Sequence, residues 1–339
     1  MAAGNRTVRL ARRPQGEPVA ADWTIADEPV AAPGPNQVLV EVTALSVDPA
    51  MRGWLDDVAS YLPPVALGEV MRAIGTGVVL RSAHHRFPVG SQVHGMLGVQ
   101  RLATPDVRGL TLVDPSLGSA RDYLGVLGQT GLTAYFGLFE IGRPRAGDTV
   151  VVSAAAGAVG SVVGQLARLA GCRVVGIAGG PDKCAYVVDD LGFHAAIDYR
   201  NEDVATALAT SCPDGVDVYF DNVGGDVLDA TLLHLARGAR VVLCGAISQY
   251  NSVDGYAGPA NYWQLLVRRA TMQGFLVFDF TSQYSTARAR LAAWQRDGEL
   301  VGTETVVEGR VDDFPEVLLR LFRGDNRGKL VLSLGAPGE

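Results

Sequence analysis

Residues 149–171 read TVVVSAAAGAVGSVVGQLARLAG, and this stretch predicts a strand, a tight turn and a helix. The apolar run 149–154 is typical of a strand that is buried on both faces. Valines and leucines then recur at helical spacing over residues 159–169, and Gly171 ends the helix. The stretch therefore indicates the first half of a strand–helix–strand unit.

The turn itself, AAAGAVG at residues 154–160, is a Gly-x-Gly-x-x-Gly pattern with Ala155 in the first position. Gly157 would let the backbone approach a pyrophosphate, and Gly160 would let the helix pack closely on the strand. The helix N-terminus would attract the anion. A tight turn can also need glycine for structure alone, but the strand–helix–strand context favours dinucleotide binding.

Alternating strands and helices continue beyond the turn. We expect strands at residues 173–179, 195–199, 216–221, 239–245 and 273–278, and helices at residues 181–191, from 201, 228–236 and 282–296. Such units predict an α/β fold with a doubly wound parallel sheet and ligands at the carboxyl ends of its strands.

The chain on either side of this region contains shorter strands. Gly- and Pro-divided runs at residues 37–49, 73–80 and 89–97 indicate a β-rich, partly open barrel. Residues 304–334 resemble that first part in strand content, so we expect the chain to return to it. The predicted domains are 1–125, completed by 300–339, and a nucleotide-binding domain at 126–299.

Composition excludes several classes of protein. With 48% hydrophobic and 19% charged residues the chain is globular, and its net charge of −7 predicts no nucleic-acid or anionic-lipid partner. Four scattered cysteines fit reduced thiols, and residues 1–20 lack a signal-peptide core, so we expect a cytoplasmic protein. The uncharged stretch 149–167 contains serine, glutamine and glycines, which argues against a membrane span.

The second strand indicates the type of dinucleotide. NAD sites usually have an acid about 20 residues after the glycine turn, but here the strand ends in glycines 179–180. Asp182 is followed at once by Lys183, and the next strand ends at Tyr199 and Arg200. The missing acid and the added cations favour NADP, although lone basic residues are often only solvated surface charges.

The chain resembles the zinc-independent medium-chain reductases of the prostaglandin reductase, or leukotriene B4 12-hydroxydehydrogenase, group. The resemblance covers nearly the whole chain. It rests on residues 154–193, DNVGG at 221–225, CGAISQYN at 244–251, GDNRGK at 324–329, SVDPAMRG at 46–53 and GLTAYFGL at 131–138.

This resemblance implies a GroES-like barrel with an inserted Rossmann domain, NADP(H) as cofactor and a homodimer. It implies reduction of the carbon–carbon double bond of α,β-unsaturated aldehydes and ketones. It assigns the pyrophosphate to Gly157, Ala158, Val159 and Gly160, and the 2′-phosphate to Lys183 and Tyr199. It assigns the nicotinamide half to Asn222, Cys244, Gly245, Ala246, Ile247, Ser248, Tyr250, Phe275, Leu276, Val277 and Asn326.

Two features depart from this group or from its wider superfamily. Ala50 stands where the group usually has tyrosine, and GQTG at residues 128–131 replaces its usual Met-Pro sequence. The catalytic zinc of related dehydrogenases needs Cys and His ligands in the first domain. That domain has no cysteine here, and its histidines lack partner ligands at usable spacing, so we expect no metal.

The chemistry that remains is hydride transfer to the β-carbon, with hydrogen-bond donors stabilising the developing enolate. Tyr250 is the candidate proton donor, and the alternative is a residue that only shapes the pocket. Tyr61, Tyr256 and Tyr262 are weaker candidates for substrate contact. A quinone reductase and a non-catalytic NADPH-binding protein remain alternative functions.

Overall fold

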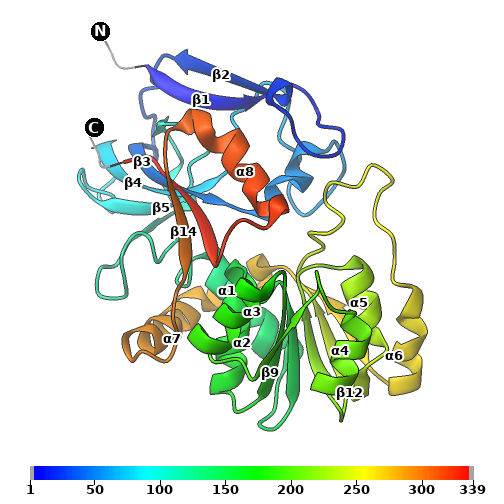
Figure 1. Ribbon diagram of the computed structural model, residues 1–339. Coiled ribbons are helices and arrows are strands. Elements are labelled where there is room, and N and C mark those ends of the chain that lie inside the picture. The colour runs from blue at the N-terminus through cyan, green and yellow to red at the C-terminus, as the bar shows by residue number, and fades with distance from the viewer. Residues whose placement is uncertain (1–3, 336–339) are drawn as a thin grey trace. The chain divides into compact units, whose positions relative to one another are not determined.

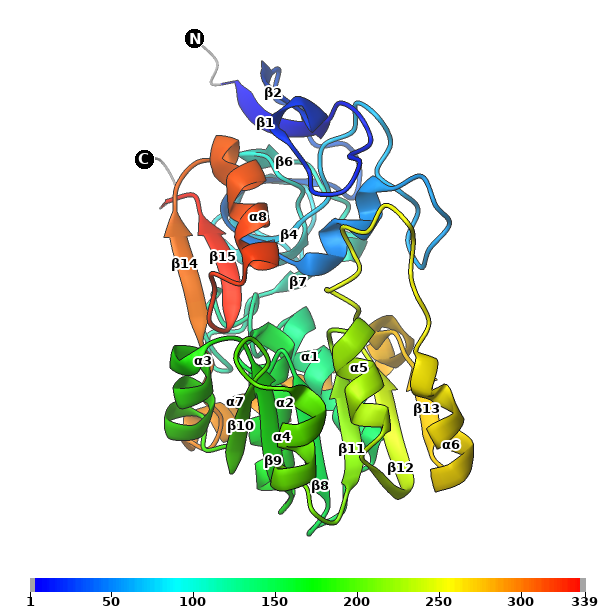
Figure 2. The same cartoon turned by 45° about the vertical axis from the view of Figure 1, so that its right-hand side comes forward.

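Strand β8 (Thr149–Ser153) lies inside a six-stranded parallel sheet, in the order β10-β9-β8-β11-β12-β13 (Figure 2). The computed structural model describes residues 4–335. The other strands of this sheet are β9 (Arg173–Ala178), β10 (Ala195–Asp198), β11 (Val216–Asp221), β12 (Leu235–Leu243) and β13 (Thr271–Gly274). The strand order reverses between β8 and β11, which is where doubly wound sheets bind ligands.

Helices cover both faces of this sheet (Figure 1). One face carries α1 (Gln129–Phe136), α2 (Ala158–Leu169) and α7 (Tyr284–Arg296), and the other carries α4 (Val204–Ser211), α5 (Gly225–Leu232) and α6 (Trp263–Arg268). A short helix, α3 (Pro181–Ala185), links β9 to β10. Val150, Val151 and Val152 of β8 are fully buried because both faces are covered, as their continuous apolar run predicted.

The chain divides into two units: Met1–Leu124 with Glu304–Glu339, and Gly125–Thr303. The first unit contains a mainly antiparallel sheet in the order β14-β15-β3-β4-β5-β7, with β6 on β3. Its strands are β3 (Val38–Val47), β4 (Ile74–Ser82), β5 (Gln92–Met96), β6 (Leu102–Ala103), β7 (Leu110–Leu112), β14 (Glu304–Glu308) and β15 (Lys329–Ser333). The predicted α/β class with a β-rich first part is confirmed.

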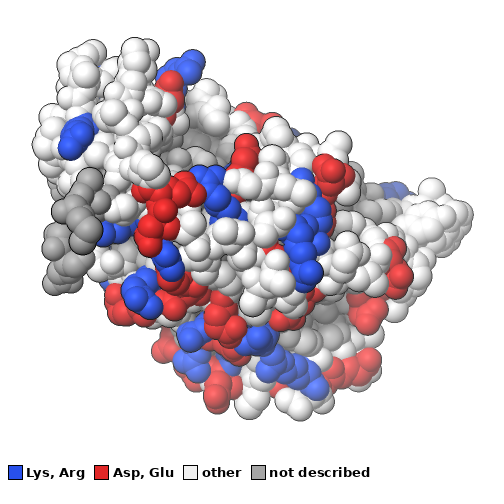
Figure 3. Space-filling view, turned by 90° about the horizontal axis from the view of Figure 1, so that it is seen from above, with Lys and Arg blue, Asp and Glu red and all other residues white. Residues whose placement is uncertain are grey.

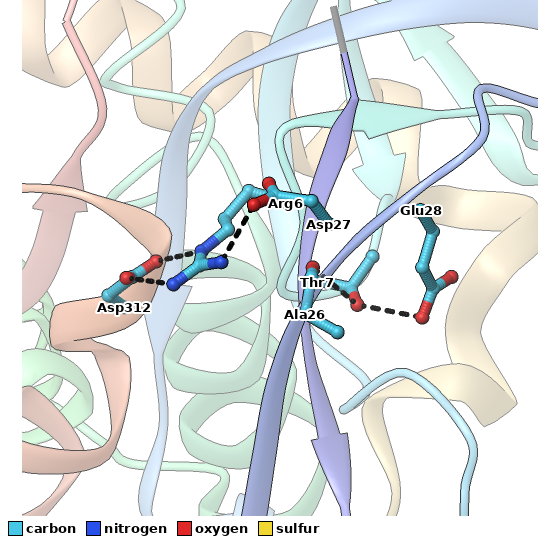
Figure 4. A network of polar contacts seen from close by, with 6 residues as sticks. All are labelled: Arg6, Thr7, Ala26, Asp27, Glu28 and Asp312. Carbon is cyan, nitrogen blue, oxygen red and sulfur yellow. Dashed lines mark hydrogen bonds and ion pairs between the residues drawn. The ribbon is translucent and has the colours of Figure 1, made fainter.

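Within the first unit, the first two strands contact residues from the C-terminal part of the sequence. Strand β1 (Asn5–Leu10) pairs with β2 (Trp23–Glu28), and helix α8 (Phe314–Arg323) packs Phe314 edge-on against Trp23 at 5.8 Å. Figure 4 shows Arg6 between Asp312, at 2.7 and 2.8 Å, and Asp27, at 3.0 Å. The bonds between Arg6 and Asp312 join residues 306 positions apart.

The bounds of several elements differ from the sequence-based expectation, and strand pairing explains two of these differences. The helix expected at residues 228–236 ends at Leu232, because Leu235 already pairs with Val216 of β11. The strand expected at 273–278 ends at Gly274, opposite Leu243, where β12 also ends. The chain continues as a short 3-10 helix, Val277–Gln283.

Charges of both signs are interspersed on the face drawn in Figure 3, without a continuous basic area. Among residues 4–335, no helix has the length and apolar character needed to cross a bilayer.

Candidate functional site at the carboxyl edge of the parallel sheet

All six strands of the sheet are parallel, so the residues that follow them gather at one edge. A sequence-predicted site residue follows each strand within a few positions. In sheet order these are Tyr199 after β10, Lys183 after β9, Gly157 after β8, Asn222 after β11, Cys244 after β12 and Phe275 after β13.

The turn after β8 is shaped by close backbone contacts. Ala154 adopts a left-handed conformation with φ of 48°, and its carbonyl accepts the Gly157 N–H at 2.8 Å. A Cβ on Gly160 would lie 2.3 Å from that same carbonyl oxygen, so no larger residue fits there without movement. Helix α2 begins with Ala158 and Val159, and Gly157 is its N-cap residue. Because glycine has no side chain to cap the helix, the first N–H groups stay open to an anion.

The ends of β9 and β10 form a second part of the edge. Tyr199 and Arg200 fold their side chains over Gly179, where a Cβ would lie 2.9 Å from the tyrosine hydroxyl and 3.0 Å from the arginine Nε. Gly180 has φ of 91°, and Lys183 follows it in α3. The structure thus places Tyr199 and Arg200 against Gly179, four residues before Lys183 in the chain.

Asp198, which the sequence analysis did not single out, holds these two strand ends together. Its Oδ1 accepts the N–H groups of Gly180 at 2.7 Å and Arg200 at 3.1 Å, and its Oδ2 accepts the Asn201 amide at 2.7 Å. Burial alone would raise the pKa of Asp198, but these hydrogen bonds outweigh it and lower the pKa below its ordinary value. Only side-chain contacts identify this role, because an aspartate at a strand end has no distinctive sequence signal.

Asn222 is fixed by β8. Its backbone N–H donates to the Ser153 hydroxyl and its side-chain amide to the Ser153 carbonyl, both at 2.8 Å. Next to it, the buried Asp221 carboxylate accepts the Tyr219 hydroxyl at 2.8 Å and the Gly224 N–H at 3.0 Å. Burial raises the pKa of Asp221. This second carboxyl was also missed by the sequence analysis.

The turns after β11 and β12 are joined by backbone hydrogen bonds. Cys244 and Gly245 donate to the Asp221 carbonyl, and the N–H groups of Ile247 and Ser248 donate to the carbonyls of Asn222 and Val223. Burial and the Asp221 charge raise the pKa of Cys244 to about 12. The thiol therefore stays protonated near neutral pH and is no nucleophile.

Tyr250 folds back over this joined pair of turns. Its hydroxyl oxygen accepts the Ala246 N–H at 3.2 Å and lies where a Cβ on Gly245 would be 3.1 Å away. Its ring meets that of Tyr256 edge-on at 6.4 Å. The phenol is thus held above the carboxyl ends of β11 and β12.

Phe275 follows β13 and packs edge-on against Phe220 at 6.4 Å. Gly137 leaves the room for its ring, because a Cβ there would be 2.5 Å from the Phe275 Cζ. Val277 is buried and Leu276 is 37% exposed. This triplet therefore extends the edge beyond β12.

Three predicted site residues, Tyr61, Tyr262 and Asn326, take no part in these contacts at the carboxyl ends of the strands. Tyr262 is 62% exposed, and Tyr61 and Asn326 belong to the first unit. The Tyr61 hydroxyl accepts the Trp54 indole N–H at 3.2 Å, and the Asn326 amide donates to the Gly328 carbonyl at 2.8 Å. Their parts in a site stay predictions.

Within residues 4–335, no three His, Cys, Asp or Glu side chains are grouped as a metal ion would require. His84 and His85 stack on each other at 4.9 Å, and His94 lies in β5.

Two family models match the chain. One, described as the N-terminal domain of oxidoreductase, matches residues 6–113, and the other, described as zinc-binding dehydrogenase, matches residues 158–293. The NADPH-dependent curcumin reductase of Escherichia coli (strain K12) is 38% identical over 97% of this chain and 96% of its own. The NADP(+)-dependent 2-alkenal reductase of Nicotiana tabacum is 37% identical over 97% of each chain.

A solved structure extends this similarity to the fold. The crystal structure of CurA from Vibrio vulnificus in complex with NADPH matches 98% of this chain and 100% of that chain, with a TM-score of 0.92 and 41% identity. Because relatives this similar span almost the entire sequence, the chain belongs to the zinc-independent medium-chain dehydrogenase/reductase family, in the group of NADP-dependent alkenal, curcumin and prostaglandin reductases.

Proposed function

We propose that the protein reduces the carbon–carbon double bond of α,β-unsaturated aldehydes and ketones with NADPH as hydride donor. The observation that carries this proposal is the edge of the parallel sheet, where a predicted cofactor residue follows every strand. The similarity to curcumin and alkenal reductases supports the class of substrate.

The residues at this edge fit a dinucleotide phosphate. Gly157 and Gly160 leave the space that a Cβ would fill, at the N-terminus of the 12-residue helix α2. Gly179 offers no carboxylate for a ribose 2′-hydroxyl, and Lys183 and Tyr199 would hold a 2′-phosphate instead. Asn222, the segment from Cys244 to Tyr250 and the Phe275 triplet would line the nicotinamide half, with Asn326 as a further candidate.

Bound NADPH would supply a hydride to the electrophilic β-carbon. The chain must then stabilise the negative charge that develops on the substrate oxygen and deliver a proton to the α-carbon. The Ala246 N–H donates to the Tyr250 oxygen, and such a bond favours negative charge on that oxygen and strengthens the phenol as a donor. Tyr250 is therefore the proposed acid, acting directly or through water.

Tyr256 lies against Tyr250, so it is the best placed of the proposed substrate contacts. Tyr61 and Tyr262 remain weaker candidates. Ala50, where the group usually has tyrosine, lies in the short helix Pro49–Met51 and packs, partly buried, against the core of the first unit.

We also propose a homodimer and a cytoplasmic location. All four cysteines are free thiols, which fits a reducing compartment. Strand β13 ends the sheet order, and β12 is its one neighbour there. An edge strand of this kind can pair with its copy about a two-fold axis.

The deciding experiment follows NADPH oxidation with a panel of enals, enones, quinones and simple ketones, and NADH serves as the cofactor control. We expect turnover with enals and enones, a saturated product, and a strong preference for NADPH. Turnover with quinones alone would identify a quinone reductase. Tight NADPH binding without turnover of any compound would point to a non-catalytic binding protein.

A further inference from the structure

A second cation, Arg200, lies beside Gly179, in addition to Lys183 and Tyr199, which were assigned to the 2′-phosphate. Arg200 follows Tyr199 directly after β10, and its side chain is exposed to solvent. Its Nε lies against Gly179, where a Cβ would be only 3.0 Å away. Any acidic side chain at position 179 would have to displace both Tyr199 and Arg200. The guanidinium therefore occupies the neighbourhood in which NAD-binding sheets place a carboxylate.

The carboxylate of Asp198, at the end of β10, is occupied by hydrogen bonds within the neighbouring turns. Asp198 is 7% exposed, and its oxygens accept the N–H groups of Gly180 and Arg200 and the amide of Asn201. These bonds direct its charge into the turn. The same bonds fix the backbone of Arg200 relative to the end of β9. Asp198 thus helps to orient Arg200.

We propose that Arg200 is a specificity-determining residue that holds the cofactor's 2′-phosphate, and that Asp198 is its positioning residue. A guanidinium can donate two parallel hydrogen bonds to a phosphate, whereas Lys183 offers a point charge on a flexible stem. Together they match the doubly charged phosphate better than Lys183 alone. This inference rests on the proposed use of NADPH.

The test compares two probes that differ only in the 2′-phosphate: adenosine 2′,5′-bisphosphate and adenosine 5′-monophosphate. Calorimetry on the full chain would measure both dissociation constants. For Arg200→Gln we expect about tenfold or more weaker binding of the bisphosphate, since a hydrogen bond to a charged group contributes about 1.5–3 kcal/mol. Monophosphate binding should change less than about twofold, because the lost contact is absent from that complex.

Two further variants serve as controls. Arg173→Gln removes the same charge at the opposite end of β9, where the arginine donates to the Ser211 carbonyl, and should leave both affinities unchanged. Lys183→Gln should weaken bisphosphate binding as Arg200→Gln does. Arg200→Lys should restore only part of the loss, because it keeps the charge without the paired donors.

The outcomes separate this inference from the proposed function. If the wild-type protein shows no preference for the bisphosphate, the proposed cofactor is wrong. If the wild type prefers the bisphosphate and Arg200→Gln keeps the full preference, Arg200 has no such role. For Asp198→Asn we expect a smaller preference ratio with monophosphate affinity retained, and an unchanged ratio would remove the positioning role of Asp198.

Discussion

At the scale of single residues, the Tyr250 hydroxyl is the group on which the proposed chemistry depends. Replacing it with Tyr250→Phe keeps the ring that packs against Tyr256 and removes the oxygen that accepts the Ala246 N–H. We expect kcat for an enone to fall by about 10²-fold, the lower end of what a general acid contributes. The KM for NADPH should change less than kcat, because the variant keeps the ring that would line the nicotinamide half and loses only the hydroxyl.

A matched hydroxyl removal controls for general effects. Tyr135→Phe deletes a phenol oxygen that Arg290 contacts, on a helix that contributes none of the proposed site residues. Steady-state kinetics with one enone would compare both variants. If Tyr250→Phe kept the full kcat, Tyr250 would only shape the pocket and would not be the acid.

The residues themselves explain why the sequence predicted only part of the edge. Gly160 carries its own signal, since a Cβ there would lie 2.3 Å from the Ala154 carbonyl oxygen and a larger residue would force the turn to shift. Asp198 accepts the backbone N–H of Gly180, which lies 18 positions earlier in the sequence. Asp221 accepts the N–H of Gly224, in the turn that follows it. Strand-end aspartates occur for many reasons, so only the folded contacts reveal theirs.

At the scale of elements, pairing between strands sets the ends of two elements that the sequence patterns predicted wrongly. The periodicity over residues 228–236 is helical, yet Leu235 joins β12 because Val216 of β11 pairs with it. The apolar run at 273–278 has the composition of a strand, yet pairing ends with β12. Long elements with a repeated pattern were predicted well, whereas these two ends depended on a neighbouring strand.

Strand β14 offers a test of how an element responds to pH. Its first residue, Glu304, has a side chain that is 16% exposed and lies 3.6 Å from Arg121. Burial and the charge of Asp122 raise its pKa to about 7, against the opposing charges of Arg121 and Lys329. A raised pKa in the folded state means that its contribution to stability is present at low pH and is lost as pH rises toward 7.

We therefore expect Glu304→Gln to be more stable than the wild type at pH 8, and its advantage to disappear at pH 5. Urea unfolding at both values would measure the shift in midpoint. Glu308→Gln, at the exposed end of the same strand, controls for the loss of a carboxylate. An equal midpoint shift at both pH values would contradict the proposed ionisation of Glu304.

At the scale of the whole molecule, helix α6 of the second unit has an exposed apolar surface that is suited to burial in a dimer interface. Trp263, Leu266 and Val267 of α6 are 62%, 64% and 44% exposed, and they recur at helical spacing. Helix α6 precedes the edge strand β13 in sequence and lies beside it in Figure 2. An open strand edge next to exposed aromatic and aliphatic side chains is suited to burial against an identical copy.

We expect the protein to elute as a dimer, with light scattering giving twice the chain mass of 35.7 kDa. Leu266→Glu should shift it to the monomer, because each protomer would bury an unpaired carboxylate at a two-fold interface. Val89→Glu, which places the same charge on an exposed valine of the first unit, should leave the dimer intact. A wild-type monomer at micromolar concentration would refute the homodimer. A dimer that survives Leu266→Glu would move the interface away from α6.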